Sequence, residues 1–220
     1  MKFFIKPIIF LLFLIGENNL FAQKFTPGLI AGAVASDLIG IDPTDTDFHK
    51  VGFTLGGLLN TKLSSKNSLQ FEILYTRKGS LQPADSSNNY VQYNLSLDYI
   101  EIPLLYKHNI QFNVGKKTMD RFYLEAGPSF GRLLKTNINT NGNYYFAGNF
   151  KKNEFAINLG AGAKLINNLY FNIRFSNSIL AIVDHLNPDN GFFFATFNKG
   201  HNMLLSFTLK YLFNSTTNNN

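Results

Sequence analysis

Apolar and polar residues alternate with a period of two along most of this chain, and this alternation limits the folds that it can adopt. The last segment shows it clearly. One row carries the apolar residues Met203, Leu205, Phe207, Leu209, Tyr211 and Phe213. The positions between them carry Leu204, Ser206, Thr208 and Lys210. Successive side chains of a β-strand point to opposite faces, so such rows predict strands with one apolar face.

Seven further segments predict strands. Six alternate clearly and begin near Val51, Leu69, Ile100, Phe122, Phe155 and Leu169, and a weaker Gly/Ala-rich one covers residues 26–36. The connections between strands alternate in length. The shorter ones are 63–67, 110–119 and 166–168, and the longer, polar ones are 37–50, 80–92, 135–152 and 183–200. This arrangement predicts an all-β fold, an eight-stranded antiparallel transmembrane β-barrel in an up-and-down meander, with short periplasmic turns and long extracellular loops.

The first 22 residues predict export from the cytoplasm. Lys2 and Lys6 precede an apolar run over 7–15, and the small residue Ala22 stands just before Gln23. This pattern is typical of a cleaved signal peptide, and the run is too short for a membrane anchor. We therefore expect a signal peptide at 1–22, a barrel at 23–213, a polar tail at 214–220, and a location in the outer membrane.

Composition excludes several other classes of protein. The chain contains no Cys, which excludes a disulfide scaffold, a cysteine-ligated zinc site and a cysteine nucleophile. The formal net charge is +6, but the basic residues are scattered. An exported protein does not meet nucleic acid, so we expect no nucleic-acid partner.

Alternation alone does not decide which face points outward. A soluble lipocalin-like barrel would place its apolar rows inside. Here these rows are too bulky for the narrow interior of eight strands, whereas the opposite rows carry glycines and charges. We therefore predict that the apolar rows face lipid. The residues expected on that face are Phe71, Ile73, Ile102, Leu104, Leu124, Phe171, Ile173, Leu205, Phe207 and Leu209.

The inward rows carry charges of both signs. They are Glu72, Glu101, Lys107, Glu125, Lys164, Arg174 and Lys210. Unpaired charges in a narrow lumen are costly, so opposite signs should pair across it. We predict a polar, hydrogen-bonded plug without a continuous water channel. The alternative is that lumen water solvates these charges without specific pairing.

Neither catalytic nor metal-binding chemistry is indicated. The histidines are His49, His108, His185 and His201, and none shows the His-x-Ser pairing of lipid-modifying barrel enzymes. Asp184 is adjacent to His185, but no nucleophile accompanies them. Asp42, Asp45 and Asp47 could hold Ca²⁺, yet they lack the glycine and glutamate of an EF-hand loop, so we read them as a solvated acidic loop. We expect no catalytic, cofactor-binding or metal site and no cofactor.

Four segments resemble the PorT-like outer-membrane β-barrel proteins of Bacteroidota. They are 69–79, 97–107, 124–131 and 159–165, and the most specific part is the Tyr-Ile-Glu-Ile-Pro-Leu-Leu run at 99–105. The resemblance covers residues 25–213. It implies an outer-membrane barrel, and its named member implies an accessory role in type IX secretion. The matching segments are barrel-wall residues, so they support the fold but do not assign the role.

The function that we expect is that of a non-enzymatic envelope protein. Its long extracellular loops would contact a protein partner outside the cell or in an envelope complex, and its wall would contact outer-membrane lipid. The alternatives are a narrow channel or small-solute porter, which would conduct ions, and a lipid-modifying enzyme, which would change lipid masses.

Overall fold

The computed structural model of the protein describes residues 25–39, 48–86, 90–114, 117–141, 150–184 and 199–213. The expected signal peptide, the polar tail, the three aspartates of the first long loop and His185 lie outside these residues. None of the described segments forms a helix that is long and apolar enough to cross a membrane.

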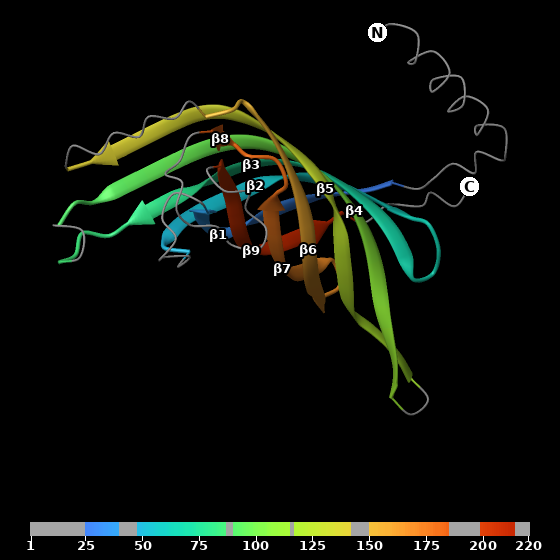
Figure 1. The fold of residues 1–220 in the computed structure, drawn as a ribbon. Coiled ribbons are helices and arrows are strands. Elements are labelled where there is room, and N and C mark those ends of the chain that lie inside the picture. Colours follow the sequence, from blue (N-terminus) through green and yellow to red (C-terminus); the bar gives the residue numbers. More distant parts are fainter. Residues whose placement is uncertain are drawn as a thin grey trace, which may run out of the picture.

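The sheet closes on itself. Its strands are β1 (Phe25–Ile39), β2 (Lys50–Lys62), β3 (Asn67–Gln82), β4 (Tyr93–Val114), β5 (Lys117–Thr140), β6 (Asn153–Ile166), β7 (Leu169–Ser178), β8 (Val183–Asp184) and β9 (Lys199–Leu212). Consecutive long strands pair antiparallel, and β9 pairs with both β7 and β1. The two-residue β8 only adds a short ladder to β9. Eight long strands therefore form a closed up-and-down barrel, which confirms the predicted fold class (Figure 1).

The two ends of the barrel differ. Phe25 of β1 pairs with Thr61, beside the 63–66 turn, and Gly28 pairs with Leu212 of β9. The first and last described residues therefore lie at the same end as the short turns, as expected. We call this the turn end and the opposite one the loop end. In an outer-membrane barrel the turn end faces the periplasm and the loop end faces outward.

Side chains alternate between the two faces of the wall. Among the residues expected to face lipid, the exposed fractions of Phe71, Ile73, Leu104, Leu124, Ile173, Phe207 and Leu209 are 38–51%. Ile102, Phe171 and Leu205 are half-buried. Their neighbours Glu72, Glu125, Arg174 and Thr208 are buried inside. Large apolar side chains therefore cover the outer wall, as lipid contact requires.

Strands β4 and β5 are longer than the alternation predicts. The expected connection over 110–119 is wrong, because Phe112 pairs with Met119 and Val114 with Lys117. At the other end β5 continues to Thr140, so the expected 135–152 connection begins later. On the β4 side of this hairpin, Ile110, Phe112 and Val114 still alternate with polar residues, so the strand could have been extended from the sequence. The polar end of β5 shows no such pattern, and backbone pairing does not require an apolar face.

At the loop end β3, β4 and β5 continue together past the other strands (Figure 1). We call residues 78–82, 93–98 and 133–140 of these strands the extension. A β-bulge sets its base, because Asp98 pairs with Lys135 whereas Tyr99 pairs with Leu133. The extra residue, Leu134, locally increases the twist of the ladder.

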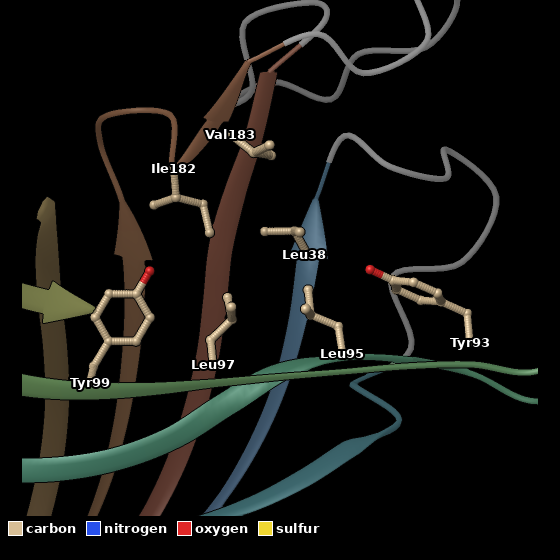
Figure 2. Close-up of a cluster of buried hydrophobic side chains, with 7 residues drawn as sticks. All are labelled: Leu38, Tyr93, Leu95, Leu97, Tyr99, Ile182 and Val183. Atoms are coloured by element: carbon tan, nitrogen blue, oxygen red, sulfur yellow. The ribbon is translucent and has the colours of Figure 1, made fainter. Parts of the chain in front are cut away.

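The inner face of the extension is apolar and covers the barrel interior. Figure 2 shows β4 side chains that face Leu38 of β1 and the segment after β7. The cluster consists of Leu38, Tyr93, Leu95, Leu97, Tyr99, Ile182 and Val183. A second inward cluster, of Ile30, Leu58 and Leu74, lies lower in the barrel. The expectation of a polar interior is therefore wrong at the loop end, where the chain itself, rather than water, covers the inward side chains.

Candidate functional site: a layered barrel interior

Four charged side chains meet in the middle of the lumen. Arg174 of β7 binds Glu72 of β3 through two hydrogen bonds, Nη1 to Oε2 and Nη2 to Oε1, both 2.8 Å long. The Nε of Arg174 also donates to Oε1 of Glu125 on β5, at 2.8 Å. Lys210 of β9 donates to Oε2 of Glu125, at 2.9 Å. We call these four residues the central quartet.

The quartet takes one residue each from β3, β5, β7 and β9. Strands β3, β5 and β7 alternate around the wall, where inward side chains stack in common layers, and β9 pairs directly with β7. Two carboxylates face two cations, and every member is at most 5% exposed. The bidentate Arg–carboxylate pair and the second ammonium offset the cost of burying these charges.

Lys107 borders the quartet without joining it. Its Nζ donates to Oε1 of Gln70 at 3.1 Å, and Gln70 in turn donates to Glu72. The same Nζ lies 4.0 Å from the centre of the Tyr123 ring and 5.7 Å from that of Tyr170. Aromatic faces attract cations, so both rings help to hold this buried ammonium.

A second charged layer lies nearer the loop end. The Nζ of Lys78 is 2.6 Å from Oε1 of Glu101 and 2.7 Å from Oε2 of Glu154. Ser178 and Asn202 donate to the other oxygen of Glu154. Lys78 and Glu154 are not among the predicted interior charges. Both continue inward rows of even-numbered residues, so extending the alternation by one position on each strand would have found them.

The predicted interior charges therefore fall into three places. Glu72, Glu125, Arg174 and Lys210 form the quartet, Glu101 belongs to the second layer, and Lys107 lies beside the quartet. Lys164 joins neither group. It is half-buried and lines a cavity at the turn end.

A charged pair on the outside marks the upper limit of the lipid-facing band. Nε and Nη2 of Arg77 donate to the two carboxylate oxygens of Asp98, at 2.7 and 3.0 Å. The hydrogen bonds from Arg77 lower the pKa of Asp98 below its usual range. Arg132 and Lys135 are exposed on β5 at the same height, where apolar side chains give way to charged ones.

The described histidines make structural contacts. His108 shares a 2.7 Å hydrogen bond with the side chain of Asn67, and Nδ1 of His201 lies 2.9 Å from the backbone oxygen of Ser178. The Ser178 hydroxyl donates to Glu154 instead. Within the part of the chain that the structure describes, there is no group of three His, Cys, Asp or Glu residues that could hold a metal ion.

Several solved structures are similar to this chain at low sequence identity. Ail, the attachment invasion locus protein of Yersinia pestis, is 10% identical with a TM-score of 0.45, and the match covers 87% of this chain and 100% of Ail. Neisserial surface protein A is 12% identical with a TM-score of 0.44, covering 86% and 97%. The outer membrane protein AlkL is 15% identical with a TM-score of 0.40, covering 87% and 92%. No curated protein matches the sequence.

A family profile provides the identification. The profile described as "Outer membrane protein beta-barrel domain" matches residues 21–183, most of the chain. The closed antiparallel sheet and the apolar outer wall are typical of outer-membrane β-barrels. The chain therefore belongs to the outer membrane protein β-barrel domain family.

Proposed function

We propose that this protein is a non-conducting, non-enzymatic outer-membrane barrel whose extension binds a protein partner at the cell surface. The observation that carries the proposal is the edge of β5 at the loop end. Strand β6 pairs with β5 only between Phe122 and Arg132, and Leu133 donates to the backbone oxygen of Lys152. Beyond that point no described strand pairs with this edge of β5.

Against the described residues this edge is unpaired from Leu134 to Thr140, where an extended strand covers about 20 Å. Residues 134–139 are exposed on both faces, and Leu134 and Ile138 are 56% and 43% exposed. An unpaired edge presents backbone N–H and C=O groups that a partner strand can complete. The edge residues Lys135, Asn137 and Asn139 keep it soluble without closing it to a partner.

The filled lumen supports the non-conducting part of the proposal. The central quartet and the Lys78 layer place buried charged side chains at two heights, and the apolar cluster lies above them. An interior of eight strands is just wide enough for side chains to fill. A porter or channel would require the side chains of these layers to move apart and open a path for solute.

The non-enzymatic part rests on the contacts of His108 and His201, which bind an amide side chain and a backbone oxygen rather than a hydroxyl nucleophile. The resemblance to PorT-like proteins supports a more specific partner, a component of a secretion complex. In that case the edge of β5 would bind another envelope protein rather than a ligand from outside.

Photo-crosslinking tests the partner surface. A photoreactive amino acid replaces Lys135 or Asn137 in the full chain in cells, and a matched control replaces Lys66, which is exposed in a turn at the opposite end. We expect a discrete adduct from the two extension positions and none from the control. Leu134→Asp and Ile138→Asp should reduce the adduct, whereas Leu63→Asp in the turn should not. Equal adducts from both ends, or none at the extension, would refute the surface.

Two measurements test the rest of the proposal. The purified protein in planar bilayers should show no steady single-channel conductance. Overproduction should leave the masses of lipid A and phospholipids unchanged. A steady conductance would favour the channel, and an altered lipid mass would favour the enzyme.

A further inference from the structure

A cavity of about 350 Å³ opens at the turn end of the barrel, below the central quartet. Residues of two turns, 62–68 and 167–168, form part of its wall. The inward side chains of Lys107, Tyr123 and Tyr170 line it as well. Its volume lies at the lower end of the range for small-molecule sites, so it suits a small ligand rather than a polymer.

The charge of this cavity has one sign. Lys62, Lys107, Arg121 and Lys164 line it, and none of its described lining residues is an Asp or Glu. No ion pair with a described carboxylate is found for Lys62, Arg121 or Lys164. Serine and asparagine side chains from the turns add further donors to the lining. A cavity walled by cations raises the local concentration of anions.

Two buried groups point to a missing anionic partner. The quartet already balances two carboxylates against two cations, which leaves the Lys107 ammonium, in a residue only 5% exposed, with the amide oxygen of Gln70 as acceptor. The Tyr123 hydroxyl is buried and has no hydrogen-bond partner among the described residues. A buried cation without an opposite charge is costly, and an anion in this cavity would offset that cost.

We propose that the cavity at the turn end binds the phosphate group of a small organic phosphate. Ammonium groups bind phosphate as point charges, and hydroxyl and amide donors serve its remaining oxygens. The phosphate can come from two sources. One is a soluble phosphate ester in the periplasm, and the other is the headgroup of an anionic phospholipid in the adjacent leaflet. This site lies at the opposite end of the barrel from the extension and does not depend on a partner there.

Titration calorimetry on the purified full chain tests the site with both sources. The probes are glycerol 3-phosphate added to protein in a zwitterionic detergent, and phosphatidylglycerol added to protein in phosphatidylcholine nanodiscs. The test variant is Lys62→Gln with Lys164→Gln, two residues outside the central quartet that are accessible enough to replace without unfolding the barrel. The control is Lys135→Gln with Lys152→Gln, which removes the same charge from the loop end.

We expect saturable binding of at least one probe. The turn-end variant should weaken it about tenfold, since two modest Coulombic contacts are lost, and the control should keep it within about twofold. Binding of glycerol 3-phosphate identifies a soluble ester, and binding of phosphatidylglycerol alone identifies a headgroup. Absence of saturable binding by both probes, or equal weakening by the two variants, would overturn the proposal.

Discussion

The ring of Tyr123 lies over Gly162, its register partner on the neighbouring strand β6. A Cβ atom built on Gly162 would lie 2.2 Å from Cζ of the tyrosine, so the glycine leaves the space that the ring occupies. The Tyr123 ring in turn lies 4.0 Å from the Lys107 ammonium. The absence of one side chain on β6 thus positions an aromatic face for a buried cation.

Gly162→Val should therefore destabilise the barrel. The ring must move, which costs about 1–3 kcal/mol for overpacking and weakens the contact with Lys107. Urea unfolding in detergent, followed by the heat-dependent shift in gel migration, measures the change. Gly57→Ala is the matched control, because a Cβ there meets only a backbone oxygen at 3.8 Å. Equal unfolding midpoints for the two variants would contradict the packing argument.

Arg174→Met should be among the most harmful single substitutions in the lumen. It removes the bidentate partner of Glu72 and leaves two buried carboxylates with Lys210 alone, at a cost of about 3–5 kcal/mol. The free energy of unfolding in urea measures this loss. Arg77→Met breaks an ion pair whose arginine side chain is 43% exposed, and should leave the free energy of unfolding nearly unchanged. The double variant Arg174→Met/Glu72→Gln should recover part of the loss, and a double variant no better than Arg174→Met would argue against charge pairing.

Phe207→Arg tests the assignment of the outer face. Phe207 pairs with Ile173 on one side and Ala33 on the other, in the apolar outer wall. An arginine near the bilayer midplane should cost about 2–4 kcal/mol, measured as a lower yield of folded protein in lipid vesicles. Phe207→Leu keeps an apolar side chain and should fold normally. If the arginine variant folds as well as the leucine variant, the face does not contact lipid.

Single cysteines test the orientation, because the native chain has none. Thr136→Cys places a thiol on the extension, and Ser65→Cys places one in a turn at the opposite end. A membrane-impermeant maleimide should label the first on whole cells and the second only after the outer membrane is permeabilised. The reverse pattern would mean that the barrel is inverted.

The sequence predicts the wall of this barrel well because lipid contact demands an apolar residue at every second position. The rows from Met203 to Phe213 and from Phe122 to Phe130 follow that rule. Beyond the lipid, outward positions no longer need apolar residues. The alternation therefore could not reveal that β5 continues to Thr140. The alternation also could not reveal that the side chains of Leu95 and Leu97 are buried in the interior by other segments of the protein.

The sequence predicts which charged residues lie in the interior, but it does not predict every contact between them. Alternation places Glu72, Glu125 and Arg174 inside, and counting along each strand from its short turn puts these three at similar depth. The contacts between individual atoms also depend on the relative stagger of the strands, which a residue count does not fix. That stagger depends on turn lengths and on irregularities such as the register shift at Asp98. The same count puts Lys164 and Lys210 nearer the turn end. Lys164 lines the cavity there, whereas the long side chain of Lys210 reaches Glu125 in the quartet.

The central quartet has a consequence for the order of assembly. Its last member, Lys210, is on β9, the strand that also closes the sheet by pairing with β1. Until that closure, the carboxylates of Glu72 and Glu125 lack one of their two cations, and the open sheet retains unpaired edges at β1 and β9. The strand that closes the barrel therefore also supplies the last cation to the buried carboxylates. We therefore expect partly closed barrels to be less stable than the closed one.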